Sequence, residues 1–223
     1  MPRVEQVDRA RFVIRMISKT VTDFELSAAQ RQQYETTGFL VVERLFDAEE
    51  IGLLRRSAKE DKQLDDHSFG RDDGEGGTVR LSLWNHPGEG IYGAFARCKR
   101  IVSIAEQLLE DEPYHYHSKM IMKDARVGGA WAWHQDYGYW YRNGVLTPNL
   151  VSAFIAVDAA TRENGCLQVI SGSHRCGRIE HQLSGEQAGA DPERVEEILK
   201  RMPHVYVTME PGDVVFFLSL IHI

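Results

Sequence analysis

Trp131–Gly138, with the sequence WAWHQDYG, sets an imidazole and a carboxylate two residues apart. In an extended strand, residues i and i+2 project from the same face of the sheet. His134 and Asp136 are therefore predicted to grip one metal ion from one side. Two histidines and one carboxylate, with the other positions open, form the ligand set of non-haem Fe(II) sites. This stretch supplies two of those three ligands.

A His-x-Asp pattern is short, and it recurs by chance in a chain with 9 histidines. The plain alternative is a surface strand whose polar residues face water. Aromatic residues crowd the motif, however: Trp131, Trp133, Tyr137, Tyr139, Trp140 and Tyr141. A hydrophobic wall strengthens electrostatic interactions and limits solvent at a metal. The surroundings therefore favour a metal site over a surface strand.

The pattern of elements along the chain predicts an α+β protein whose β part carries the site. Helices are predicted at residues 27–37, 47–62, 101–110 and 191–201, with an early strand at 39–43. Residues 65–78 are polar and glycine-rich, which predicts a mobile loop. From residue 114 short strands are predicted at 114–122, 130–135, 151–157, 167–170, 205–209 and 214–217. Closely spaced strands of this kind are typical of a sandwich or barrel.

Length and composition favour one soluble domain. A chain of 223 residues can bury a full core, and a net charge of −7 gives no reason to expect nucleic acid or an anionic membrane as a partner. The longest apolar run, Val214–Leu218, is too short to span a bilayer. Cys98, Cys166 and Cys176 are odd in number and lack CxxC spacing, which favours reduced thiols in the cytoplasm, with Cys166 in the core. The N-terminus lacks the apolar core of a secretion signal.

Three blocks, taken in order, carry a family resemblance. They are HQD at 134–136, TRENGCLQVISGSH at 161–174 and EPGDVVFF at 210–217. Together they resemble the phytanoyl-CoA dioxygenase family of Fe(II)- and 2-oxoglutarate-dependent oxygenases. The resemblance extends from the strand that follows Gly38 onward. It implies a double-stranded β-helix (cupin-like jelly roll) with N-terminal helices packed on it. In this chain, residues 27–112 would be the mainly helical part and 113–217 the jelly-roll core of a single domain, 1–223.

The resemblance also implies roles for individual residues. His134 and Asp136 would be iron ligands. The residues expected near the cosubstrate 2-oxoglutarate are Lys119, Lys123, Arg80 and Phe154. Each of these four has a plainer interpretation, because exposed lysines are usually only solvated and Phe154 lies in an apolar run that favours the core. His174, in the GSH block, is expected to close a turn rather than to bind metal.

The third ligand departs from the family pattern. Counted from Gly212, the distal histidine should fall at position 223, but Ile223 stands there and His222 lies one place early. A slip of one residue in a strand turns a side chain to the opposite face, so His222 is predicted to be a poor substitute unless a bulge restores the register. The family also has an arginine beyond this histidine, which grips the far carboxylate of 2-oxoglutarate, and the chain ends before it.

The last six residues, LSLIHI at 218–223, are what CTG-TCT-CTT-ATA-CAC-ATC encodes. That string resembles a transposon-end adapter, so we expect a non-native tail on a C-terminally truncated sequence whose authentic part stops at Phe217. A natural apolar strand is the alternative. At the other end, Met16 is an alternative start. From a defective third ligand we expect weak iron affinity and little turnover.

The sequence-based hypothesis is an Fe(II)- and 2-oxoglutarate-dependent dioxygenase that uses O2 to hydroxylate a small organic molecule, releasing succinate and CO2. Asp136 favours hydroxylation over halogenation, because its carboxylate fills the position that a halide would need. Trp140, Tyr141 and the loop 65–78 are expected at the entrance, which favours a hydrophobic or amphipathic substrate. Two alternatives remain open: a zinc-dependent hydrolase using the same ligands, and a non-catalytic β-helix binding protein.

Overall fold

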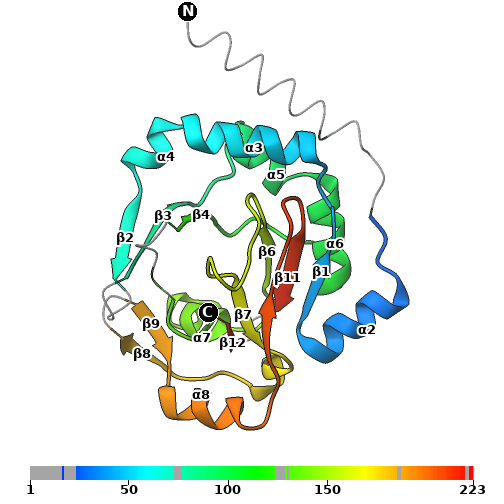
Figure 1. Ribbon diagram of the computed structural model, residues 1–223. Coiled ribbons are helices and arrows are strands. Elements are labelled where there is room, and N and C mark those ends of the chain that lie inside the picture. The colour runs from blue at the N-terminus through cyan, green and yellow to red at the C-terminus, as the bar shows by residue number, and fades with distance from the viewer. Residues whose placement is uncertain are drawn as a thin grey trace, which may run out of the picture.

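The computed structural model describes residues 17, 24–72, 77–123, 129, 131–184, 187–218 and 221–222 (Figure 1). Helices come first and are α2 (Ala28–Thr37), α3 (Ala48–Glu60), α4 (Lys62–Asp66), α5 (Ile91–Ala96) and α6 (Lys99–Leu109). Strands β1 (Phe39–Val42), β2 (Phe69–Asp72) and β3 (Thr78–Trp84) lie between them. The remaining elements are β4 (Ser118–Met122), β5 (His134–Gln135), α7 (Asp136–Trp140), η1 (Tyr141–Asn143), β6 (Val151–Ile155), β7 (Leu167–Ile170), η2 (Ser173–Cys176), β8 (His181–Ser184), β9 (Gln187–Ala190), α8 (Pro192–Leu199), β10 (His204–Val207), β11 (Val214–Leu218) and β12 (Ile221–His222).

Local capping chemistry sets the boundaries of the early helices. Ser27 and Gln30 form a capping box at the start of α2, and Gly38 ends the helix in the left-handed conformation with a φ of 83°. Asp47 caps α3 by accepting hydrogen bonds from the amides of Glu49 and Glu50. The predictions of helices at 27–37 and 47–62 are confirmed, although the second is split into α3 and the short helix α4.

The predicted loop at residues 65–78 is wrong for most of the stretch that the structure describes. Its first two residues complete α4, Phe69–Asp72 form β2, and Thr78 begins β3. β2 pairs antiparallel with β3, with Arg71 opposite Val79. The polar composition reflects an exposed strand rather than a loop, because three of the four β2 residues are exposed. Residues 73–76 lie outside the described residues.

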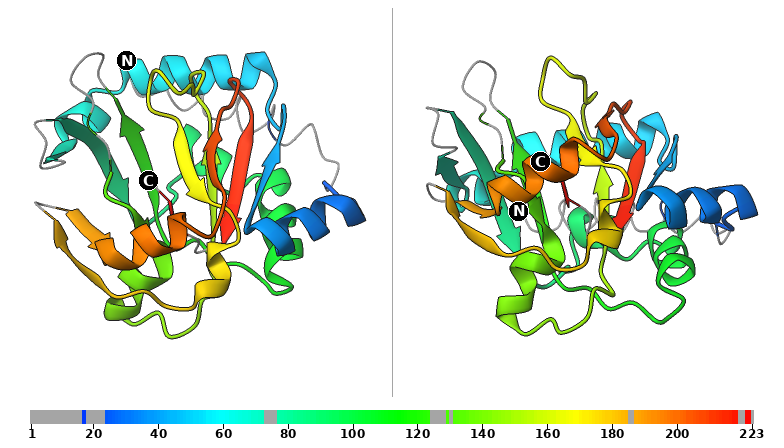
Figure 2. Two further views of the ribbon diagram at one scale, coloured as in Figure 1. Left: turned by 60° about the horizontal axis from the view of Figure 1, so that its bottom comes forward. Right: turned by 90° about the horizontal axis from the view of Figure 1, so that it is seen from below.

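The strands form antiparallel sheets. One of them places β12, at the end of the chain, beside β5. The strand orders are β1-β11-β6, β10-β7-β12-β5 and β2-β3-β4, with β8 and β9 as a separate hairpin. Figures 1 and 2 show α3 lying across one end of the β1-β11-β6 sheet. Helices before strands in a mixed layered arrangement make this an α+β fold, as the sequence predicts.

β11 is the strand on which the two main clusters of buried side chains meet. Val214 and Phe216 point into the cluster shared with the helices, whereas Val215 and Phe217 point into a cluster shared with β7 and β10. All four side chains are almost fully buried. A strand covered on both faces has a continuous apolar sequence instead of an alternating one, which explains the run VVFF. β11 thereby ties the helical layer to the sheet that carries the metal-ligand candidates.

Cys98, Cys166 and Cys176 are all free thiols, and Cys166 is buried as predicted. Within the described part of the chain, no helix combines the length and the apolar character that crossing a membrane requires.

Replacing Phe46 with alanine tests the helix–sheet core. Phe46 is 1% exposed, its ring centroid lies 4.6 Å from that of Phe95, and the Arg100 guanidinium lies 4.6 Å from the same ring. Phe46→Ala should lower the free energy of unfolding by about 3–5 kcal/mol, because it leaves a cavity among rigid neighbours. Phe69→Ala, at a side chain that is 41% exposed, should cost less than about 1 kcal/mol. Urea unfolding measures both, and equal losses would contradict this core assignment.

Candidate metal centre

The HQD motif does not form one continuous strand, which corrects the geometry expected from the sequence. His134 and Gln135 make up β5, but Asp136 is already the first residue of α7. Gln135 is extended, with φ −122° and ψ 120°, so the chain turns from strand to helix directly after it. The two side chains still converge, because His134 Nε2 lies 4.0 Å from Asp136 Oδ1. A strand-to-helix turn therefore achieves what strand alternation was expected to provide.

His222 lies beside these two residues, contrary to the expectation that its register turns it away. Its Nε2 lies 3.8 Å from Asp136 Oδ1, and one ligand atom from each of the three residues lies within 4.8 Å of the others. The expectation failed because it counted alternation along β11 as far as residue 222. His222 belongs to β12, which pairs with β5 and β7 in the other sheet, directly opposite His134 and Val169.

Hydrogen bonds fix which atoms of this cluster are left to bind a metal. His134 Nδ1 lies 2.8 Å from the carbonyl oxygen of Ala132. A carbonyl only accepts, so Nδ1 carries the proton and the Nε2 lone pair faces the cluster. Ser152 Oγ donates to Asp136 Oδ2 at 3.0 Å and leaves Oδ1 toward the histidines. Two imidazole nitrogens and one carboxylate oxygen fit the ligand preferences of Fe(II).

Burial and mutual charge effects keep the cluster in the protonation state that a metal requires. Burial, followed by the nearby His222, holds the pKa of His134 far below its usual range. Burial alone would raise the pKa of Asp136, but His222, His134, Lys119 and the hydrogen bond from Ser152 together outweigh it and leave that pKa lowered. Metal binding needs neutral imidazole and ionised carboxylate. Both ligand types are therefore ready at neutral pH.

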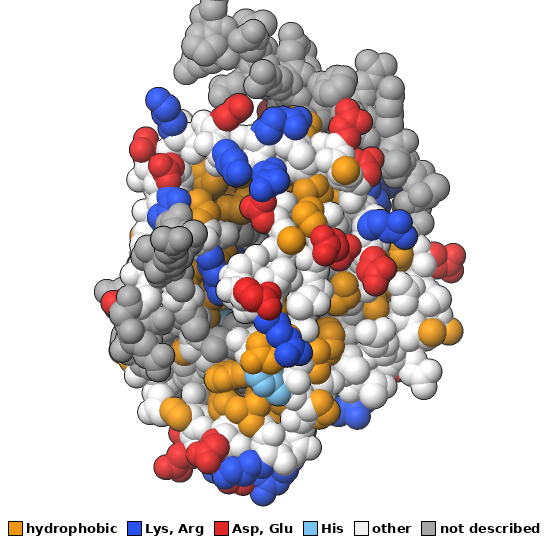
Figure 3. Space-filling model, in the orientation of Figure 1, with side chains coloured by type: hydrophobic (Ala, Val, Ile, Leu, Met, Phe, Trp, Pro, Cys, Tyr) orange, Lys and Arg blue, Asp and Glu red, His pale blue; other side chains and the backbone are white. Residues whose placement is uncertain are grey.

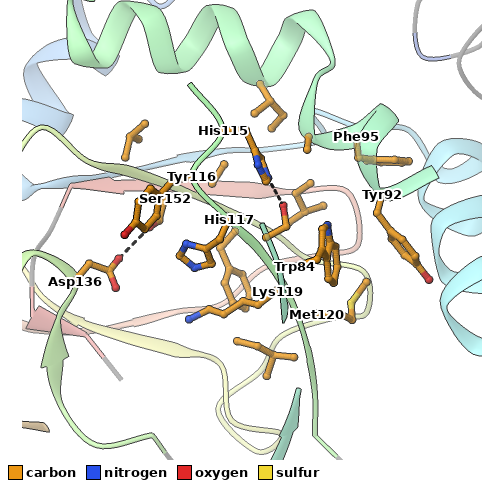
Figure 4. Close-up of a pocket in the computed structure, with 18 of the residues that line it drawn as sticks. Trp84, Tyr92, Phe95, His115, Tyr116, His117, Lys119, Met120, Asp136 and Ser152 are labelled. Carbon is orange, nitrogen blue, oxygen red and sulfur yellow. Dashed lines mark hydrogen bonds between the residues drawn. The ribbon is translucent and has the colours of Figure 1, made fainter. Parts of the chain in front are cut away.

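A cavity of about 1700 Å³ borders the cluster and is lined by all four residues expected near the cosubstrate. Figure 3 shows the surface hollowed below α3, with hydrophobic side chains in its wall. Lys119 points from β4 toward Asp136 (Figure 4), and its Nζ lies 5.7 Å from the ring centroid of Trp131. Its positive charge contributes to the lowered pKa of Asp136. Lys119 is exposed, yet its charge acts on both His134 and Asp136.

The other three expected cosubstrate residues have different surroundings. Lys123 Nζ donates to the carbonyl of Gly165 at 3.0 Å. Arg80 forms an ion pair with Asp65. Phe154, in β6, packs partly buried against the cluster that Val215 and Phe217 enter. Each lines the cavity, but none shows the direct electrostatic effect on the ligand cluster that Lys119 shows.

Of the three remaining sequence candidates, Trp140 lines the cavity, whereas Tyr141 and His174 do not. The ring centroid of Trp140 lies 5.1 Å from that of His117. Tyr141 is 41% exposed and stacks under the Arg178 guanidinium instead. His174 lies in the short 3-10 helix η2, and its Nε2 lies 3.2 Å from the carbonyl oxygen of Glu35, in a distant segment of the chain.

Sequence reasoning missed two residues that border the ligands. His117 points toward Asp136 beside Lys119 in Figure 4, and its position two residues before Lys119 was a usable signal, because alternate strand residues share a face. Ser152 had no such signal. It lies in a predicted strand, and only the pairing of distant segments brings it to Asp136.

Comparison with known proteins places these features in a family. Residues 34–222 match the family model described as phytanoyl-CoA dioxygenase (PhyH). The chain is 28% identical to the ectoine dioxygenase of Sphingopyxis alaskensis over 216 residues, which cover 90% of this chain and 70% of that protein. It is 40% identical to the L-proline trans-4-hydroxylase of Streptomyces griseoviridis over 104 residues, which cover 46% of this chain but only 39% of that enzyme.

Solved structures agree with this assignment. EctD from S. alaskensis with 2-oxoglutarate and 5-hydroxyectoine matches with a TM-score of 0.75 and 26% identity, over 88% of this chain and 69% of that one. The same enzyme with bound Fe matches with a TM-score of 0.73 and 25% identity, again over 88% of this chain and 69% of that one. These relatives are non-haem iron and 2-oxoglutarate-dependent dioxygenases. With its His134-Asp136-His222 cluster, this chain belongs to the phytanoyl-CoA dioxygenase family.

Proposed function

We propose that this protein is an Fe(II)- and 2-oxoglutarate-dependent dioxygenase that hydroxylates a small organic molecule. The observation that carries the proposal is the convergence of His134, Asp136 and His222, whose ligand atoms lie within 4.8 Å of one another beside a large cavity. When bound, Fe(II) with 2-oxoglutarate and O2 supplies an oxidative decarboxylation that yields succinate and CO2 and places one oxygen atom on the substrate.

The chain's own residues orient the ligands for this chemistry. His134 and His222 present imidazole nitrogens, and Asp136 presents Oδ1. The Ala132 carbonyl holds the ring of His134 in one tautomer, and Ser152 holds the carboxylate of Asp136 in one orientation. Such partners raise the basicity of metal ligands and limit their rotation. Trp131 and Trp140 contribute an apolar wall to the cavity beside these ligands.

Lys119 is the residue we propose to hold a carboxylate of 2-oxoglutarate. Among the described residues it forms no ion pair, whereas Arg80 is engaged by Asp65 and Lys123 by the Gly165 carbonyl. An ammonium beside three metal ligands is a favourable contact for an anionic cosubstrate. Lys123, Arg80 and Phe154 then contribute to the cavity wall farther from the ligands.

We also propose that residues 1–223 form one oxygenase domain, with a jelly-roll core over 113–217. The sheets β1-β11-β6 and β10-β7-β12-β5 support this, because Phe217 of the first and Val169 of the second share one buried cluster. The metal ligands come from the second of these sheets and from α7.

The substrate is proposed to be a hydrophobic or amphipathic small molecule that binds against the aromatic wall near Trp140. Trp140 contacts Tyr116, His117 and Tyr139 with ring centroids 4.8–5.1 Å apart. Rings packed edge to face or tilted in this way give a large apolar surface with few conformations to lose on binding. The relatives named for ectoine and proline also act on small organic molecules.

Asp136→Ala tests the chemistry. Removing the carboxylate should abolish succinate release in a substrate screen and eliminate the weak visible band expected when Fe(II) and 2-oxoglutarate bind together without oxygen. Asp66→Ala is the matched control, because Asp66 is exposed at the end of α4 and does not line the cavity. Undiminished succinate release by Asp136→Ala would refute the assignment.

His222→Ala tests the third ligand separately from the first two. Loss of one of three protein ligands should weaken Fe(II) binding at least about 10-fold, judged against the 10–100-fold losses known for residues that only support ligands. His204→Ala serves as the control, since His204 is exposed and bonds to Gln168 instead. Anaerobic Fe(II) titration measures both variants. Unchanged affinity in His222→Ala would show that this histidine is not a ligand.

Lys119→Met and Lys123→Met separate the two lysines. Lys119→Met should raise the Kd of 2-oxoglutarate about 10-fold or more, because a charge-assisted hydrogen bond contributes about 1.5–3 kcal/mol. Fe(II) affinity should change little. Lys123→Met should leave the cosubstrate Kd within about 2-fold, because that lysine bonds to Gly165. Anaerobic titration with 2-oxoglutarate gives both values, and the reverse order of effects would move the site to Lys123.

A further inference from the structure

The peptide between the first two metal-ligand candidates is held by a buried histidine from a distant segment. Gln135, between His134 and Asp136, is 1% exposed, and its backbone N–H donates to His181 Nε2 at 2.9 Å. His181 begins β8 and is 4% exposed. Its Nδ1 lies 2.9 Å from the carbonyl oxygen of Ile179. The carbonyl requires a proton on Nδ1, so Nε2 is a lone-pair acceptor and the ring is neutral.

The side chain of Gln135 binds the same distant segment. Its Nε2 donates to the Gly177 carbonyl at 2.8 Å, and its Oε1 accepts from the Ile179 amide at 3.1 Å. The amide N–H of Gln135 and both polar side-chain atoms are thus satisfied by residues 177–181. Buried hydrogen bonds of this number restrict the position of the backbone strongly, because each one broken would leave an unpaired polar group.

His181 also contacts the chain on the far side of Asp136. A Cβ atom built on Gly138 would lie 2.2 Å from His181 Cε1 and 2.7 Å from the Ile179 carbonyl oxygen. Only a glycine allows the first turn of α7 to approach the ring this closely. The imidazole therefore touches the backbone both immediately before and two residues after the carboxylate ligand.

The β8–β9 hairpin also hydrogen-bonds to the backbone just before His134. The Ala190 amide donates to the Trp133 carbonyl at 2.7 Å, and the Ala132 amide donates to Gln187 Oε1 at 2.6 Å. Ala132 is the residue whose carbonyl orients the ring of His134. Figure 1 shows β8 and β9 beside α7, in agreement with these bonds. One hairpin thus fixes the backbone on which two of the three ligands stand.

We propose that His181 is a positioning residue of the metal centre: by accepting the Gln135 amide and packing on Gly138, it sets His134 and Asp136 at the separation that a metal ion requires. This inference rests on the proposed function, because it assumes that the cluster binds a metal. Ligand sets tolerate displacements of only about 0.5 Å, and loss of an outer partner typically weakens metal binding about 10–100-fold.

Co(II) titration followed by visible absorption tests the proposal without turnover or substrate. His181→Leu removes both polar atoms at similar size and should weaken Co(II) binding about 10–100-fold. It should also change the band shape, since the ligand geometry is altered. His181→Gln places an oxygen acceptor at nearly the same reach and should recover affinity to within about 3-fold of the unaltered chain.

A matched control separates positioning from stability. Val195→Ala thins the packing around Ile179 but removes none of these hydrogen bonds, so it should lower the free energy of unfolding and leave Co(II) affinity unchanged. Circular dichroism and urea unfolding establish that each titrated variant is folded. Should His181→Leu not fold, Gln135→Met is titrated in its place, with a loss of Co(II) affinity again expected.

Two failures are distinguishable. If the unaltered chain binds Co(II) and folded His181→Leu binds it equally well with the same spectrum, His181 is only a structural residue and the inference is wrong. If the unaltered chain itself binds no Co(II), the metal site fails, and the proposed function falls together with the inference.

Discussion

The pairing of β12 with β5 is the contact on which the metal site depends. It sets His222 directly opposite His134, so that two imidazoles approach one carboxylate from adjacent strands. Neither strand is long, since each has two residues. Their position is held from outside: β12 also pairs with β7 at Val169, and β5 is fixed through Gln135 by His181. The short pair is therefore defined by its neighbours more than by its own hydrogen bonds.

The core explains why those neighbours can be rigid. β11 is buried on both faces and joins the helical layer to the cluster that contains Val169. Close-packed interiors transmit displacement with little compression, so a ligand carried next to such a core has few alternative positions. Burial also has an electrostatic consequence at the site itself. It disfavours charged imidazole, whereas the neighbouring groups, and not burial, keep the pKa of Asp136 below its usual value.

The sequence was sufficient to predict the features that depend on contacts between residues near one another in the chain. Ser27, Asp47 and the Gly38 turn mark helix ends through contacts within a few residues, and the HQD motif identified His134 and Asp136 as a pair. Sequence reasoning failed where contacts between distant segments determine the position of a residue. Asp136 enters a helix, and His222 changes sheet, so alternation counted along one strand does not apply to either. His181 lies 46 residues from Gln135 and carries no motif that would link them.

X-ray absorption of the iron-loaded protein at the iron K-edge tests the central claim most directly. Imidazole rings bound to a metal give characteristic multiple-scattering features, so the number of histidine ligands can be counted without catalysis. The account predicts two imidazoles and at least one carboxylate oxygen on the iron, with one imidazole lost in His222→Ala. A spectrum with a single imidazole in the unaltered chain, or with oxygen ligands alone, would contradict it.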